Sequence, residues 1–333
     1  MRLKGKKVLV LGGAGFIGSA LVRGLLKEGA NVIVYDNFSF GHLANLKEIE
    51  GQITIINGDI LNKEHLVESF KENEIEVVFH LVADPYVPNS YRDPDGVFNL
   101  ITKGTENVAN ACVEASVEKI LYLSSAEIYG NFKYLPIDER HPPNPLSVYA
   151  KAKMEAEKLC ASFNEKHGIP LTTVRLFNAF GPRETHPYII PELISQLSKS
   201  NVIHLGNLES RRSFIFVDDA AGGMIEIVKR APNGELLNLG TERSYSVREL
   251  AFIIGKMFRH GDVKIIVDRQ RQRDSDPKAL ECDYSKVRKL IGWQPTTSFE
   301  SGLEKTRKWF LQNGSRWIWE ETYSKLESVK TAI

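Results

Sequence analysis

The sequence has few cysteines, no long apolar run and no excess of one charge. Its three cysteines, Cys112, Cys160 and Cys282, are too far apart for a CxxC metal or redox motif. Such a small, odd number fits a reducing compartment better than a disulfide framework. The apolar run after MRLKGKK is short and ends in glycines, which disfavours a signal peptide or a membrane span. We therefore expect a cytoplasmic protein without a membrane partner.

Basic and acidic residues almost cancel, with 43 Lys plus Arg against 42 Asp plus Glu, a formal net charge of +1. Nucleic-acid binding needs a basic excess or stripe, so this balance disfavours a nucleic acid as the main partner. None of the eight histidines forms HExxH or another ligand spacing, so no metal site is expected. The length of 333 residues suggests about two globular domains.

In the first half of the chain, short β-branched runs alternate with segments of helical period. The runs are almost uniformly apolar, as in parallel strands that are covered on both faces. This order predicts a doubly wound parallel α/β sheet of the Rossmann type over residues 1–177. The expected strands are 7–11, 31–35, 53–57, 77–81, 120–124 and 171–175, and the expected helices are 16–28, 65–72, 105–117 and 148–167.

The alternation becomes less regular after the Pro-rich loop GPRETHP. Residues 178–330 are predicted to form a smaller C-terminal α/β lobe that binds the substrate, with some of the chain crossing back to the first domain. Helices are expected at 188–199, 219–230 and 247–259, and short strands at 236–239 and 263–267.

The first expected strand runs into the glycine-rich segment GGAGFIG. Gly12 allows a tight turn, Gly15 lets the backbone approach a pyrophosphate, and Gly18 permits close packing of helix on strand. The pyrophosphate would lie at the positive N-terminus of the helix. A plain glycine-rich turn is the structural alternative.

Two acidic residues follow the next expected strands. Asp36 stands where an acid is expected to bind the adenosine ribose. It would repel a 2′-phosphate, and no arginine follows it in NFSFGH, so NAD is favoured over NADP. Asp59 is placed either to meet the adenine or to cap the next helix, and both interpretations stay open.

Tyr149 and Lys153 form a YxxxK motif in an expected helix, so both side chains share one helix face. A lysine ammonium and an oxidised nicotinamide would both favour the phenolate of the tyrosine. A chance surface pair is the alternative. Ser125 and Glu127 follow a strand at the edge where ligands bind, where Glu127 is either a base for a carbon acid or a solvated loop acid.

Together, GGAGFIG, Asp36, HLVAD, SSAEIYG and YxxxK resemble the extended short-chain dehydrogenase/reductase family, and more closely its NAD-dependent nucleotide-sugar epimerase/dehydratase branch. The resemblance continues through RLFNAFGPR, RRSFIFVDD, RQRDSDP and CDYSKVRKLIGWQP, so it covers nearly the whole chain. It implies a homodimer formed through the helices near Thr105 and Ala152.

The resemblance implies that Ser125, Tyr149 and Lys153 form a catalytic triad. Tyr149 would take the proton of the sugar C4 hydroxyl as hydride passes to NAD, and Lys153 would lower the pKa of Tyr149 and hold the nicotinamide ribose. Asn178, Arg212 and Arg273 would bind the diphosphate of a nucleotide sugar. The expected cofactor contacts are Gly12, Gly15, Phe16, Ile17, Gly18, Asp36, Asn37, Asp59, Ile60, Leu81, Ala83, Asn99, Tyr149 and Lys153.

The outcome after C4 oxidation depends on Glu127. Dehydratases and related decarboxylases of this branch commonly carry glutamate at the matching place, so the resemblance slightly favours a 4,6-dehydratase with Glu127 as the C5 base. Ala126, where several dehydratases carry Asp or Ser, and Val82, which replaces a usual alanine, weaken that case. A 4-epimerase of UDP-glucose or UDP-glucuronate is the alternative, and a non-catalytic Rossmann sensor is a second. The sequence does not identify the nucleobase or the sugar of the substrate.

Overall fold

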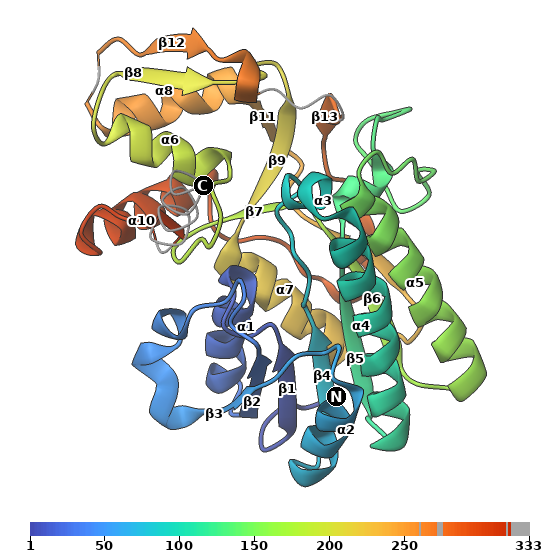
Figure 1. Ribbon diagram of the computed structural model, residues 1–333. Helices are drawn as coiled ribbons and strands as arrows, with labels where there is room; N and C mark the ends of the chain where they lie inside the picture. The colour runs from blue at the N-terminus through green and yellow to red at the C-terminus, as the bar shows by residue number, and fades with distance from the viewer. Residues whose placement is uncertain (260, 272–275, 318, 321–333) are drawn as a thin grey trace.

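The central sheet of the computed structural model has seven parallel strands in the order β10-β6-β5-β4-β1-β2-β3 (Figure 1). The structure describes residues 1–259, 261–271, 276–317 and 319–320. This sheet confirms the predicted Rossmann-type fold. Its strands are β1 (Lys7–Leu11), β2 (Asn31–Asp36), β3 (Thr54–Asn57), β4 (Val77–His80), β5 (Lys119–Ser125), β6 (Leu171–Leu176) and β10 (Leu236–Leu239).

Both faces of the sheet are buried, which explains the uniformly apolar strands. In β1, Val8 and Val10 pack on one face, whereas Leu9 and Leu11 pack on the other, as the two-residue period of a strand requires. The first face is covered by α1 (Phe16–Lys27) and α7 (Val217–Arg230). The second is covered by α2 (Lys63–Glu72), α4 (Pro94–Glu114) and α5 (Val148–His167).

The helix expected at 105–117 begins much earlier, at Pro94. Asp93 caps it by accepting a hydrogen bond from the Gly96 amide at 2.9 Å, and proline is favoured at the first helical position. The short α3 (Asn89–Arg92) precedes this helix. The expected start at 105 was wrong, since Gly104, directly before it, lies in the middle of the helix and does not begin it.

The second lobe contains two small sheets and the helices α6, α8 and α10, with a core of its own (Figure 1). Two of its elements, α7 and β10, return to the central sheet. The described part contains no helix long and apolar enough to cross a membrane. The remaining α-helices and β-strands are β7 (Asn178–Phe180), α6 (Ile189–Leu197), β8 (Val202–Leu205), β9 (Arg211–Phe216), β11 (Ser244–Ser246), α8 (Val247–Met257), β12 (Lys264–Val267), β13 (Ala279–Leu280), α9 (Ser285–Ile291) and α10 (Phe299–Gln312).

Candidate active site

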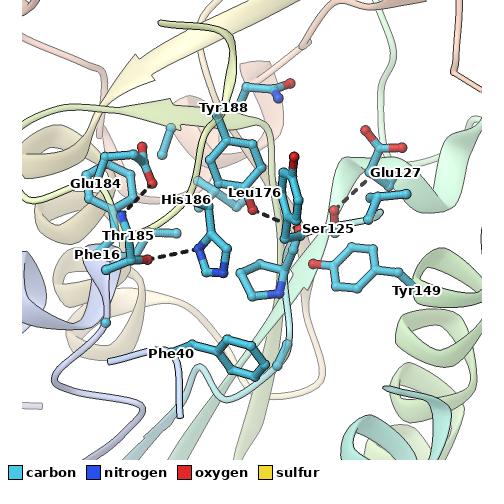
Figure 2. A pocket seen from close by; sticks show the side chains of 18 of the residues that line it. Phe16, Phe40, Ser125, Glu127, Tyr149, Leu176, Glu184, Thr185, His186 and Tyr188 are labelled. Atoms are coloured by element: carbon cyan, nitrogen blue, oxygen red, sulfur yellow. Dashed lines mark hydrogen bonds between the residues drawn. The ribbon is translucent and has the colours of Figure 1, made fainter. Parts of the chain in front are cut away.

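A cavity of about 710 Å³ lies at the carboxyl ends of the central strands and is lined by both lobes (Figure 2). This edge is where ligands bind in open α/β sheets. The lining includes nearly all the site residues expected from the sequence: Gly12, Gly15, Phe16, Ile17, Gly18, Asp36, Asn37, Asp59, Ile60, Leu81, Ala83, Ser125, Glu127, Tyr149, Lys153, Asn178 and Arg212.

The glycine-rich turn has the shape that a dinucleotide requires. Gly12 has a φ of +82°, a conformation that side chains disfavour. A Cβ atom on Gly18 would lie 2.0 Å from the Gly12 carbonyl oxygen, so the helix could not approach the turn with any larger residue. No side chain caps the N-terminus of α1, where backbone amides lack partners within the helix. The turn therefore fits a pyrophosphate.

Asp36 is fixed directly beside this turn. Its two carboxylate oxygens accept hydrogen bonds from the amides of Ala14 and Phe38, each at 2.9 Å. Burial raises the pKa of Asp36, and these two hydrogen bonds oppose the rise. The carboxylate is thus held at the wall of the cavity, where the adenosine ribose is expected.

Asp59 belongs to the same end of the cavity. It accepts a hydrogen bond from Asn37 at 3.0 Å and one from the Leu61 amide at 2.8 Å. The cap of α2 is Asn62, which accepts from the His65 amide. The helix-cap interpretation of Asp59 is therefore wrong, and contact with the adenine stays a prediction.

Tyr149 and Lys153 lie one turn apart on α5, whose start is set by the Ser147 cap. Both are buried, with 7% and 2% of their surfaces exposed. Lys153 donates a hydrogen bond to the Leu123 carbonyl at 2.8 Å, and Tyr149 is hydrogen-bonded to the Ser125 side chain. This burial excludes the interpretation of the motif as a chance surface pair.

Burial controls the protonation of this pair. It raises the pKa of Tyr149 above its usual range, although the hydrogen bond to Ser125 opposes the rise. Burial also lowers the pKa of Lys153 to about 8. The resemblance implied that Lys153 lowers the pKa of Tyr149, but in this structure the desolvation of the phenol dominates.

Glu127 lies in the short helix η3 (Ala126–Tyr129), which follows β5 directly. Its backbone amide donates to the Ser125 hydroxyl at 3.2 Å, and its side chain is half-buried in the cavity wall. Its negative charge contributes to the raised pKa of Tyr149, so the two groups are within electrostatic reach. Figure 2 shows Glu127, Ser125 and Tyr149 on the same side of the cavity.

The second lobe supplies cations to the other wall. Arg212 is buried on β9, with hydrogen bonds to Ser210 at 2.6 Å and Asp276 at 3.3 Å. Arg271, which the sequence analysis did not assign, also lines the cavity and pairs with Glu192 at 2.8 Å. Guanidinium groups suit phosphate oxygens. Arg273, expected to share this role, lies outside the described residues.

Asn99 is not part of this cavity. Its side chain is exposed on α4, whereas Ile101 is buried on the opposite face of the same helix. Residues two positions apart in an α-helix differ by about 200° around the helix axis. Asn99 and Ile101 therefore cannot both face the sheet. The expected cofactor contact at Asn99 is therefore wrong.

Sequence reasoning missed one segment of the cavity wall, Glu184 to Tyr188. It lies within the loop GPRETHP and the residue after it, where no periodicity marks an inward face. The feature of the sequence that could have indicated a site here is the pair Glu184 and His186, which lies between two prolines.

A buried histidine beneath the site predicts a specific pH dependence of stability. His80 is fully buried next to Thr105, and burial lowers its pKa from 6.5 to about 3. As the pH falls below about 6.5, the unfolded chain binds a proton that the folded chain does not, so unfolding becomes easier by up to about 1.4 kcal/mol per pH unit. Urea unfolding at several pH values measures this effect. Below about pH 6.5, the free energy of unfolding should fall less steeply with decreasing pH in His80→Gln than in the wild type. Equal pH dependence in the two proteins would contradict the low pKa of His80.

Comparisons with known proteins agree with this geometry. The family model described as GDP-mannose 4,6 dehydratase matches residues 9–306. The dTDP-D-glucose 4,6-dehydratase of Mus musculus is 29% identical over 94% of this chain and 90% of its own. A putative UDP-glucose 4-epimerase of Methanocaldococcus jannaschii is 31% identical over 92% of this chain and 99% of its own. The structure of a dTDP-glucose 4,6-dehydratase from Streptomyces venezuelae with NAD bound superposes with a TM-score of 0.86, at 26% identity, over 94% of this chain and 99% of that one.

Proposed function

The chain belongs to the GDP-mannose 4,6 dehydratase family, an NAD-dependent branch of the extended short-chain dehydrogenases/reductases, and we propose that it is a nucleotide-sugar 4,6-dehydratase. The observation that carries this choice is Glu127, a carboxylate in the same cavity wall as Ser125 and Tyr149. A dehydratase needs a base for the C5 proton, and a simple 4-epimerase does not.

Each residue of the site has one task in this reaction. When bound, NAD supplies the acceptor that takes the C4 hydrogen as hydride and returns it later. When NAD is bound, the positive charges of its oxidised nicotinamide and of the Lys153 ammonium would oppose the effect of burial and favour the phenolate of Tyr149, which would then accept the proton of the C4 hydroxyl. Ser125 orients that hydroxyl through its bond to Tyr149. Lys153, one helical turn from Tyr149, would hold the ribose of the cofactor.

The ketone at C4 acidifies the neighbouring C5–H bond, which Glu127 is placed to break. Glu127 then passes a proton to the departing C6 hydroxyl, which leaves as water. The two protons taken from O4 and C5 equal the two delivered, one to the leaving hydroxyl and one back to C5. The hydride taken from C4 would end at C6, in place of the hydroxyl that left, so the net reaction is loss of one water with the cofactor unchanged.

Arg212 and Arg271 would bind the diphosphate of the sugar nucleotide. Their positive charges lie on the second lobe, away from the Ser125 and Tyr149 wall. A sugar anchored by its diphosphate would extend from this lobe towards Tyr149. The nearly neutral total charge of the chain is compatible with such a local cationic site.

One observation favours the second candidate, a 4-epimerase. Ala126, buried next to Glu127, offers no second acid for the departing C6 hydroxyl. An epimerase needs only C4 oxidation and return of the hydrogen to the other face. A sensor without turnover is less consistent with a complete set of Ser125, Tyr149 and Lys153 in one cavity.

Incubation of the purified protein with UDP-, GDP-, dTDP- and CDP-hexoses tests the proposal. Mass spectrometry is expected to show loss of one water from at least one substrate. An isomer of unchanged mass would establish the epimerase instead.

A further inference from the structure

The segment Glu184–Tyr188 has no task in the proposed reaction, yet it joins the two lobes across the cavity (Figure 2). The His186 ring lies 5.8 Å from the Phe40 ring and 5.6 Å from the Tyr86 ring, centroid to centroid. Tyr188 donates a hydrogen bond to the Pro85 carbonyl at 2.8 Å. These contacts connect the chain before α6 to two loops of the first lobe.

The order of the strands places this segment over one part of the cofactor site. Phe40 follows β2, and Tyr86 follows β4, while β1 lies between these two strands in the sheet. The His186 ring lies near both Phe40 and Tyr86, so it is placed over the carboxyl end of β1, the strand between β2 and β4. The turn from Gly12 to Gly18, which fits a pyrophosphate, begins at that end.

Two buried polar side chains of the segment use only part of their hydrogen-bonding capacity. Glu184 is 1% exposed and accepts from the Thr185 amide at 3.3 Å, and His186 is 3% exposed with Nδ1 3.0 Å from Thr185 Oγ1. Within the described chain, neither the second Glu184 oxygen nor His186 Nε2 has a hydrogen-bond partner. Both residues line the cavity.

Burial favours the neutral form of both groups. Burial raises the pKa of Glu184 well above its usual range and lowers the pKa of His186 to about 4. A protonated carboxyl donates a hydrogen bond, and a neutral imidazole has one donor nitrogen. A phosphate oxygen accepts from such donors without the repulsion that a carboxylate would cause.

We propose that Glu184 and His186 are positioning residues that clasp the diphosphate bridge of NAD from the second lobe. The proposal rests on the assignment of NAD as cofactor and is independent of the dehydratase outcome. Phe40, Tyr86 and Tyr188 hold the clasp in place. An enzyme that takes hydride from a sugar and returns it benefits from a cofactor that stays bound throughout the cycle.

The test measures binding of NAD and of ADP-ribose to cofactor-free full-length protein by titration calorimetry. His186→Ala and Glu184→Ala should each weaken both ligands by about tenfold, because each loses a hydrogen bond to a charged group. ADP-ribose keeps the diphosphate and lacks the nicotinamide, so equal losses for both ligands support the clasp. Glu184→Gln, which keeps a neutral donor, should bind NAD nearly as the wild type does.

Tyr134→Phe is the control, because this exposed tyrosine also loses one hydroxyl hydrogen bond, to Asp138, and does not line the cavity. It should leave both affinities unchanged. Should His186→Ala misfold, His186→Asn provides the same measurement with a smaller change. The clasp would be overturned if folded His186→Ala and Glu184→Ala proteins bound both ligands as tightly as the wild type does. It would also be overturned if these variants lost affinity for NAD but not for ADP-ribose. A wild type that binds NAD through this segment but releases no dehydrated product would overturn only the proposed function.

Discussion

Replacing Tyr149 with phenylalanine is expected to lower kcat by about 1000-fold. The substitution removes a single hydroxyl from a ring that is packed in the core beneath the cavity, so the fold should persist. That hydroxyl is the proposed acceptor of the C4 hydroxyl proton, and without it the first oxidation stops. Steady-state turnover with the best nucleotide sugar measures the loss, and calorimetric titration verifies that NAD still binds.

The Tyr134→Phe variant provides the matched comparison, and its kcat should remain within about twofold of the wild type. Retention of more than about a tenth of the wild-type kcat in Tyr149→Phe would show that another group takes the proton. A large loss confined to the Michaelis constant would also contradict the account, since it would indicate a binding role.

The substitution Glu127→Gln is expected to separate the two halves of the reaction. The amide has the size of the carboxylate but cannot accept the C5 proton, so dehydration should fall by about 1000-fold. Oxidation at C4 should continue, because Tyr149 and Ser125 are untouched. Rapid-mixing absorbance should therefore show reduced cofactor accumulating, while mass spectrometry detects no loss of water.

Glu304→Gln is the control for this change, because Glu304 is an exposed carboxylate on α10 that pairs with Arg307. It should dehydrate at the wild-type rate. Full dehydration by Glu127→Gln would remove Glu127 from the reaction. Equal loss of oxidation and dehydration would place Glu127 in the first step instead.

The fold was largely predictable because its strands are buried on both faces. The expected strand 31–35 became β2 (Asn31–Asp36), and the helix at 148–167 became α5 with the same bounds. The pairing of strands that lie far apart in the sequence was harder to predict. The strand at 236–239 was expected, but its place beside β6 in the central sheet depends on a partner far away in the chain.

The candidate site was predictable where a motif follows directly after a strand. Gly12 and Ser125 line one cavity because the carboxyl ends of parallel strands meet at one edge of the sheet. Glu184 and His186 were not found, because their loop reaches the cavity through contacts between lobes. Asn99 was placed wrongly because it was assigned by resemblance alone, and the helix that contains it turns this side chain to the surface.

The most direct test of the dehydratase assignment is to follow a deuterium label at C4 of the nucleotide hexose. The hydrogen that leaves C4 returns to C6 in a dehydratase, so NMR of the wild-type product should show deuterium in a C6 methyl group beside a C4 ketone. Deuterium that remains at C4, with that centre inverted, would contradict the dehydratase assignment and establish a 4-epimerase.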